Sequence, residues 1–302
     1  MPNLVWRIGD ITITKIVEME SAVVGGGPKS ALTETYPERI KEISWLIPHF
    51  ATDEGHLRMS VHALLVETPS IRLVVDTCVG EDKARTVPHW NKLTGGTFLA
   101  DMEGAGWPPQ SVEGVLCTHL HVDHVGWNTI WRDGRWMPTF PKAKYYMART
   151  EFKHWRRECE AGPQNEFSEF AQFMMNSKET YLDSVKPIFD AGLAVFVETD
   201  AAITPEIRLT PTPGHTPGHV SVVLESRGER AVITGDMMHH PCQIAHPNWS
   251  SQFDTDPRQS ERTRLAFFET FADTPTLIIG THFAGPTAGR LVRRDGAYRM
   301  EI

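Results

Sequence analysis

The stretch THLHVDHVGW, residues 118–127, holds three histidines and an aspartate within six positions. It follows the apolar run 112–117, which predicts a short strand that stops at this cluster. Histidine and aspartate are common ligands of transition-metal ions, and a rigid strand that delivers them into a loop fixes the coordination geometry. The alternative is a solvated polar loop or a helix cap formed by Asp123. Further candidate ligands elsewhere in the chain would favour the metal site over this alternative.

Three other predicted strands end at residues of the same kind. Residues 207–213 lead into the turn TPGHTPGH, while the runs 230–235 and 276–281 stop at an aspartate and a histidine. The candidate metal ligands are His119, His121, Asp123, His124, His215, Asp236 and His282. Seven donors exceed one tetrahedral ion and suit two ions with one bridging carboxylate. We therefore expect two divalent transition-metal ions, Zn²⁺ as first choice, with Mn²⁺, Fe²⁺ or Co²⁺ as alternatives.

The motifs THLHVDH, TPGHTPGH, TGD and GTHF, in this order, resemble those of the metallo-β-lactamase-fold superfamily. The resemblance implies an α/β fold, a four-layer αββα sandwich of two packed mixed β-sheets with outer helices. It also implies two groups of ligands that share a bridging Asp236. One group is His119, His121 and His215, and the other is Asp123, His124 and His282.

Further residues near these motifs are candidates for supporting roles. By the resemblance, Asp76 hydrogen-bonds a ligand histidine and orients its ring, although a turn-forming aspartate after a strand is the alternative. His219 supports the site without being a primary ligand. His239 and His240 are candidate substrate contacts, and for each an ordinary structural histidine is an equal alternative. The candidate catalytic residues are Asp123 and Asp236.

Composition excludes several classes of protein. The chain has 302 residues with ordinary hydrophobic and charged fractions of 40% and 23%. Its net charge of -8 argues against a nucleic-acid surface. No segment reads as a secretory signal or as a long apolar membrane span, and the four scattered cysteines fit reduced thiols. We therefore expect a cytoplasmic protein with a small-molecule partner and no membrane contact.

The predicted organisation is one domain over residues 1–302, with an N-terminal extended segment about 21–56 and a helical insertion about 150–190. Five segments are predicted to be helical: 80–93, 96–106, 152–160, 165–189 and 256–274. Glycines at 25–27 would give hinge freedom. The apolar patch of Trp45, Leu46, Ile47 and Phe50 packs over the active-site mouth, against a second subunit in a homodimer, or on the monomer's own core.

The interval between His124 and His215 is longer than in compact N-acyl-homoserine lactonases. It is similar to that of the branch with methyl-parathion-hydrolase-like phosphotriesterases, lactonases and esterases. Where compact lactonases have a tyrosine three residues after the bridging aspartate, this chain has His239. The prediction is a dinuclear-metal-dependent hydrolase of a lactone or carboxylic ester. The alternatives are a phosphotriesterase, a mononuclear iron oxidoreductase of the persulfide-dioxygenase kind, and a non-catalytic metal-stabilised binding protein.

Overall fold

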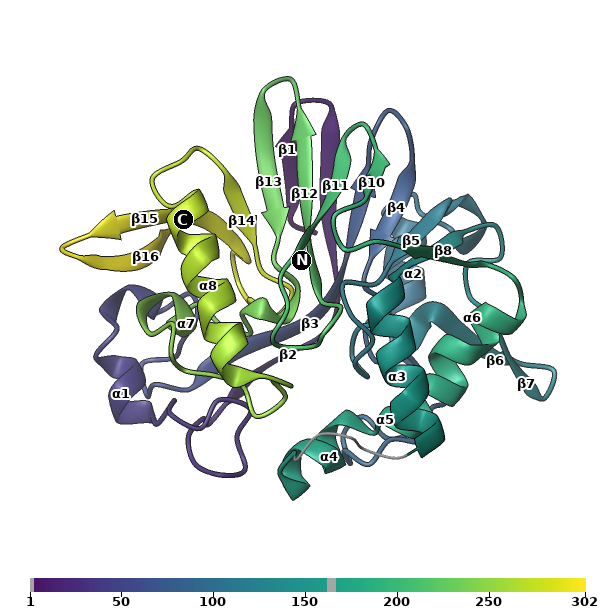
Figure 1. The fold of residues 1–302 in the computed structure, drawn as a ribbon, viewed down its shortest axis with the longest axis horizontal. Coiled ribbons are helices and arrows are strands. Elements are labelled where there is room, and N and C mark those ends of the chain that lie inside the picture. The colour runs from purple at the N-terminus through teal and green to yellow at the C-terminus, as the bar shows by residue number, and fades with distance from the viewer. Residues whose placement is uncertain (1–2, 162–166) are drawn as a thin grey trace.

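Two mixed β-sheets pack face to face, and the helices lie on their outer sides (Figure 1). The computed structural model describes residues 3–161 and 167–302. The strand order is β1-β2-β3-β4-β5-β8-β9 in the first sheet and β10-β11-β12-β13-β14-β15-β16 in the second. This arrangement confirms the predicted four-layer fold class.

Both sheets contain parallel and antiparallel pairs. The first sheet consists of β1 (Val5–Ile8), β2 (Ile11–Val23), β3 (Leu57–Glu67), β4 (Arg72–Val75), β5 (Gly114–Leu116), β8 (Lys144–Ala148) and β9 (Ala194–Val197). The second consists of β10 (Ala202–Thr204), β11 (Ile207–Pro211), β12 (Val220–Ser226), β13 (Glu229–Ile233), β14 (Leu277–Ile279), β15 (Ala288–Arg294) and β16 (Ala297–Glu301). A separate hairpin is formed by β6 (Thr129–Arg132) and β7 (Arg135–Pro138).

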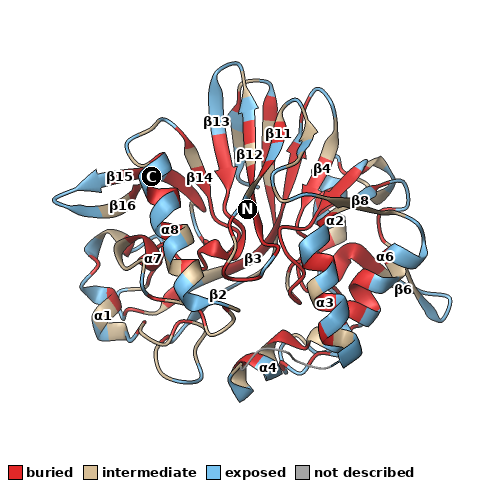
Figure 2. Cartoon of the chain, viewed as in Figure 1, coloured by how far each residue is buried: buried red, intermediate tan, exposed pale blue. Residues whose placement is uncertain are grey.

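The central strands are buried on both faces, as Figure 2 shows. In β3, Ala63 and Leu65 pack under the outer helices, whereas Leu64 and Val66 pack between the two sheets. Alternate side chains of a strand point to opposite faces, so a strand covered on both sides needs a continuous apolar run. This requirement explains the sequence VHALLVE.

The helices cover the two sheets in separate groups. The first sheet carries α2 (Phe98–Gly104), α3 (Arg149–Ala161), α4 (Glu169–Met175), α5 (Ser177–Thr180) and α6 (Lys186–Asp190), and the second carries α1 (Pro37–Lys41), α7 (Cys242–Ala245) and α8 (Pro257–Phe271). The predicted helices 96–106, 152–160 and 256–274 correspond to α2, α3 and α8. Within the described residues, no helix is both long and apolar enough to cross a bilayer.

The predicted helix at 80–93 is wrong, because this segment is a loop that closes on itself. The backbone N–H of Asp82 donates to the carbonyl of Leu93 at 2.9 Å, and the N–H of Lys92 donates to that of Lys83 at 2.8 Å. Asp82 and Lys92 both have positive φ angles, which a helix does not allow. These two backbone hydrogen bonds close the base of the loop and take the place of the predicted helix.

One part of the N-terminal segment 21–56 packs in the core, and another part lines a cavity. Leu46 and Phe50 are fully buried in the core beneath the second sheet, so this part of the apolar patch covers the monomer's own core. Residues 23–25 and 29–32 instead line a cavity of about 740 Å³. Gly25 does not serve as a simple hinge, because a Cβ there would lie 2.2 Å from Thr35 Oγ1. A close approach of two chain segments requires this glycine.

The helical insertion is broken into short pieces rather than one long helix. α4 ends at Asn176, which has a left-handed backbone, and a π-helical turn at Tyr181–Val185 separates α5 from α6. Phe152 and Trp155 of α3 are core residues, whereas Phe170 and Met174 of α4 line the cavity. Residues 162–166 of the predicted helical insertion lie outside the described part of the chain.

Candidate metal centre

Four strand ends deliver the ligand-type side chains to one place. β5 ends two residues before Thr118, and the loop after it carries His119 to His124. The turn between β11 and β12 carries His215, and Asp236 and His282 follow β13 and β14. Because β5 belongs to the first sheet and the others to the second, the site lies where the two sheets meet.

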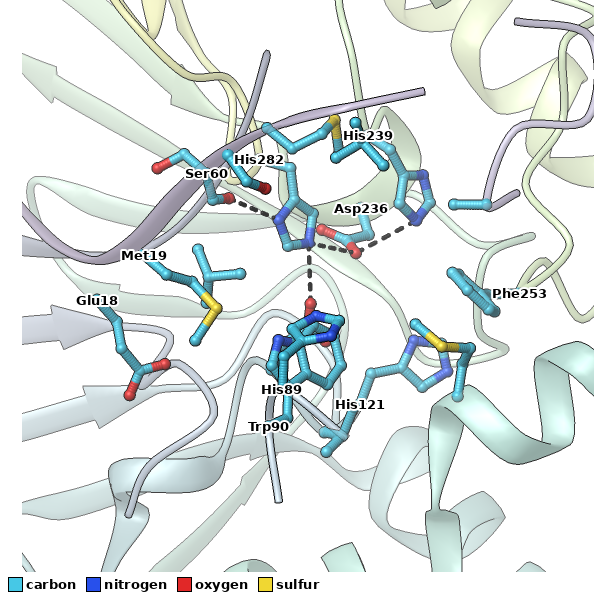
Figure 3. A pocket seen from close by; sticks show the side chains of 18 of the residues that line it. Glu18, Met19, Ser60, His89, Trp90, His121, Asp236, His239, Phe253 and His282 are labelled. Atoms are coloured by element: carbon cyan, nitrogen blue, oxygen red, sulfur yellow. Dashed lines mark hydrogen bonds and ion pairs between the residues drawn. The ribbon is translucent and has the colours of Figure 1, made fainter. Parts of the chain in front are cut away.

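One carboxylate oxygen is the centre of the cluster. Asp236 Oδ2 lies within 4 Å of the Nε2 atoms of five histidines: His119 at 3.8 Å, His124 at 3.2 Å, His215 at 3.7 Å, His239 at 3.4 Å and His282 at 3.1 Å. Figure 3 shows His239 and His282 on either side of Asp236. Thr281 Oγ1 donates to the other oxygen, Oδ1, at 3.0 Å. The carboxylate is therefore oriented by the protein with one oxygen facing the imidazoles.

The donors fall into groups that could each hold an ion. One group is His119, His121 and His215; the others are Asp123, His124 and His282; His119, His124 and Asp236; and His215, Asp236 and His239. His121 Nδ1 lies 2.9 Å from His215 Nε2, and the Nε2 atoms of His124 and His282 are 3.2 Å apart. His119 Nε2 is buried and has no hydrogen-bond partner among the described residues. Converging ring nitrogens of this kind fit metal ions.

The electrostatics of the site favour a cation. Burial by itself would raise the pKa of Asp236, but the nearby His124 and His282 hold it well below its usual range. Burial also opposes protonation of His282, yet the Asp236 carboxylate raises its pKa to about 9. Burial and neighbouring histidines lower the pKa of His119 and His121 far below normal. An anionic carboxylate among largely neutral imidazoles can exchange bound protons for metal ions.

Two aspartates orient ligand histidines from outside the cluster. Asp76 Oδ2 accepts a hydrogen bond from His124 Nδ1 at 2.9 Å and is also bonded by the Thr118 hydroxyl at 2.8 Å. Asp254 Oδ1 accepts from His215 Nδ1 at 2.9 Å. Burial alone would raise the pKa of Asp254. The hydrogen bond and the charge interaction with His215 outweigh this effect, so the pKa lies below its usual value. Each aspartate fixes the tautomer that leaves Nε2 free to bind a metal.

His219 supports Asp236 through the backbone. Its Nε2 accepts a hydrogen bond from the N–H of Asp236 at 2.8 Å, so its proton is on Nδ1, which lies 2.8 Å from Thr212 Oγ1. Burial lowers the pKa of His219 to about 3, consistent with this neutral tautomer. The ring therefore positions Asp236 and is not itself turned to the metal ligands.

Glu151, the third residue of α3, connects two ligand-bearing loops. Its Oε1 accepts from the N–H of Leu120 at 3.1 Å and from Trp155 Nε1 at 2.6 Å, and its Oε2 accepts from the N–H of Gly218 at 3.0 Å. A Cβ at Gly218 would lie 2.3 Å from the backbone nitrogen of Glu151, so only glycine allows this approach.

A cavity of about 740 Å³ opens beside the cluster. Five of its lining residues belong to the cluster: His121, Asp123, Asp236, His239 and His282. Its walls come from β2 and β3, the 81–98 loop, α4 and Phe253, and they are mostly apolar. The metal ligands therefore face a space that would accept a small, partly apolar molecule.

The model of the family described as the metallo-beta-lactamase superfamily matches residues 57–282, about three quarters of the chain. The chain belongs to this superfamily. An N-acyl homoserine lactonase of Bacillus cereus is 24% identical over 193 residues, which cover 59% of this chain and 63% of that protein. The chain thus spans less than two thirds of the length of the curated relatives that it matches.

Two solved structures show the same fold. The hydrolase AbOPH of the beta lactamase superfamily has a TM-score of 0.78 and 24% identity, covering 99% of this chain and 97% of that one. AidC, a dizinc quorum-quenching lactonase in complex with a product, has a TM-score of 0.77 and 18% identity, covering 99% of this chain and 96% of that one.

The structure brings together all seven ligands that the superfamily resemblance implies. Asp76 and His219 lie where they can support the ligands, as described above. His239 faces the cluster, but His240 does not: its Nε2 lies 2.8 Å from the carbonyl of Phe50, and its Nδ1 accepts from the N–H of Cys242 at 3.1 Å. His240 is not among the residues that line the cavity, and both of its ring nitrogens bond to backbone groups, which favours the structural alternative.

Sequence reasoning missed Asp254 and Glu151. Asp254 lies in an irregular loop two residues before the Asp-Pro start of α8, and no strand end or motif marks it. Glu151 is one of several charged residues in an amphipathic helix pattern. It lies one residue before the predicted helix 152–160 and on the same helix face as the buried Trp155, where a sequence pattern gives no reason to expect a carboxylate.

Proposed function

We propose that this protein is a dinuclear-metal-dependent hydrolase of lactones or carboxylic esters. The observation that carries the proposal is that Asp236 Oδ2 lies within 4 Å of histidines from both of two donor groups, beside a largely apolar cavity. One ion would be held by His119, His121 and His215, the other by Asp123, His124 and His282, with Asp236 between them. Zn²⁺ is the first choice for such nitrogen and carboxylate donors.

Two bound divalent ions would supply Lewis acidity towards a carbonyl oxygen and the activation of water for attack. The chain's own residues prepare that site. Asp76, Asp254 and the carbonyl of Ser60 hold the outer ring nitrogens of His124, His215 and His282, each at 2.9 Å. With the ring orientations fixed, little reorganisation is needed during the reaction.

Asp123 is the candidate for proton transfer. Its side chain is 15% exposed, more than the other carboxylate of the centre, and it lines the cavity. Its Oδ2 lies 3.4 Å from His282 Nε2, so it is at the boundary between the ligands and the substrate space. A carboxylate in this place can accept a proton from water and return it to the leaving alkoxide.

The apolar walls favour substrates with an acyl or aryl group. Apolar side chains line the cavity, among them Met19, Trp90, Phe170 and Phe253. The curated relatives are N-acyl homoserine lactonases, which makes acylated lactones the first substrates to test. Phosphotriester hydrolysis is the second candidate, because the same centre would act on a phosphoryl group and the fold neighbour AbOPH is itself a hydrolase.

A hydrolysis screen tests the proposal. The metal-free protein is reconstituted with Zn²⁺ or Mn²⁺ and offered N-acyl homoserine lactones, p-nitrophenyl esters and an aryl phosphotriester. We expect turnover of a lactone or ester that a chelator abolishes and added metal restores, with Asp236→Ala inactive. Turnover of the phosphotriester alone would favour the second candidate. No turnover of any substrate by protein that retains two ions would contradict the proposal.

A further inference from the structure

His239 is buried beside the candidate metal ligands, and its side chain has no role in the centre described so far. It is 4% exposed, and neither of its ring nitrogens has a hydrogen-bond partner among the described residues. An imidazole always carries at least one N–H, and a buried polar group without a partner costs free energy. The two ring nitrogens of His239 therefore lack a bonding partner among the described residues, and a bound metal ion would supply one.

The position of His239 matches that of the ligands. Its Nε2 lies 3.4 Å from Asp236 Oδ2, inside the range of 3.1 to 3.8 Å that the four ligand histidines span at the same oxygen. Its ring centroid is 4.8 Å from that of His215, and the donor atoms of His215, Asp236 and His239 converge closely enough to hold one ion. Figure 3 shows the ring turned towards Asp236.

The backbone holds His239 in this place. Its N–H donates to Gln243 Oε1 at 2.7 Å, and Gln243 Nε2 donates to the carbonyl of Trp249 at 2.7 Å. The adjacent His240 is fixed by the bonds to Phe50 and Cys242 already described. Two anchored residues on this short turn leave His239 little freedom to face elsewhere, which is the preorganisation that a metal ligand needs.

We propose that His239 is an eighth metal ligand, which binds the ion held by His119, His121 and His215 through Nε2. This proposal rests on the dinuclear centre proposed above. It replaces the expectation that His239 contacts the substrate. A further neutral nitrogen would raise the coordination number of this ion and make it different from the ion held by Asp123, His124 and His282. The two ions should then differ in spectrum and in affinity.

Cobalt binding tests this inference without reference to turnover. The metal-free full-length chain, His239→Gln and His239→Phe are titrated with Co²⁺ and followed by visible absorption, and Zn²⁺ affinity is measured by competition with a chromophoric chelator. His239→Phe keeps a ring of similar size, so the fold is retained if the glutamine variant is unstable. His246→Gln is the control, because its ring stacks on Trp249 at 4.1 Å, away from the cluster.

We expect both His239 variants to bind one of the two ions at least tenfold more weakly. Their cobalt absorption should become more intense, because cobalt absorbs more strongly as its coordination number falls. His246→Gln should match the wild type. Unchanged affinity and spectrum in both variants would overturn the inference. If the wild type shows the His239-dependent spectrum but hydrolyses no substrate, only the proposed activity fails; if it binds no cobalt, both fail.

Discussion

Three histidines of the candidate metal centre each bond through the outer ring nitrogen to an oxygen from a different part of the chain. His124 bonds to Asp76 near the end of β4, His215 to Asp254 in the loop before α8, and His282 to the backbone carbonyl of Ser60 in β3. A carboxylate partner makes an imidazole a stronger donor to a metal than a carbonyl does. His124 and His215 should therefore be the strongest nitrogen donors of their respective groups.

Replacing Asp254 by asparagine tests this role at a single residue. Asparagine keeps the shape, but it removes the charge, and its amide group would meet the N–H of Ser251, which now donates to Asp254 Oδ2 at 3.1 Å. We expect Zn²⁺ affinity to fall by about 10- to 100-fold. The measurement is chelator competition on the purified protein.

Asp256→Asn is the matched control, because Asp256 caps α8 through the N–H of Gln259 and asparagine caps helices equally well. Its affinity should equal that of the wild type. Equal affinities of the Asp254 and Asp256 variants would show that Asp254 does not tune His215.

At the scale of elements, the start of α3 joins the two loops that carry five of the seven candidate ligands. Glu151 accepts hydrogen bonds from both loops and from Trp155, whose ring lies 5.1 Å from that of His121. Glu151 is buried, and three of its hydrogen bonds come from N–H donors. It acts as a clamp that no motif reveals, because its partners come from distant parts of the sequence.

Glu151→Gln should loosen this clamp. The glutamine amide would place an N–H group against an N–H donor, so one buried hydrogen bond is lost and one repulsion gained. We expect the free energy of unfolding to fall by about 2 kcal/mol, measured by denaturant titration. Glu160→Gln on the exposed face of α3 should change it by less than about 0.5 kcal/mol. If the two variants are equally stable, Glu151 does not join the loops.

The 80–97 loop shows why one element could not be predicted. A helix was predicted over 80–93, but Lys83 and Arg85 of this segment are buried against Asp183 in the π-helical turn. Arg85 binds both oxygens of Asp183, at 2.6 and 3.0 Å, and Lys83 lies over the ring of Trp136 at 3.7 Å. The loop is shaped by partners almost a hundred residues away, which local periodicity does not contain.

Lys83 should make stability depend on pH. Burial lowers its pKa to about 7, although Asp183 opposes the shift. Since the unfolded lysine titrates near 10.4, the unfolded chain binds more protons between these values, and the free energy of unfolding rises with pH through that window. Lys83→Met should remove a rise of up to about 1.4 kcal/mol per pH unit.

Denaturant titrations at pH 6 and pH 9 measure this difference. Relative to Lys83→Met, the wild type should be more stable at pH 9 than at pH 6. Lys144→Met, at an exposed position of β8, should follow the wild type at both values. Parallel profiles for the wild type and Lys83→Met would contradict the assignment.

For the whole molecule, the convergence of the candidate metal ligands could be predicted and the cavity could not. These residues follow strands whose apolar runs end abruptly, so the sequence indicated that their side chains would meet. The cavity walls come from β2, the segment 23–32, the 81–98 loop and α4, which meet only after folding. Gln252, for example, binds the carbonyls of Pro28 and Ser30 and so joins the N-terminal segment to the loop of Asp254.

The central claim is that two ions share Asp236, and metal stoichiometry tests it most directly. The full-length chain is stripped of metal, reconstituted with excess Zn²⁺ or Mn²⁺, freed of unbound metal, and analysed for metal per mole of protein. We predict about two ions per chain for the wild type and fewer for Asp236→Ala, with both proteins folded. One ion or none per wild-type chain under saturating metal would contradict the dinuclear account.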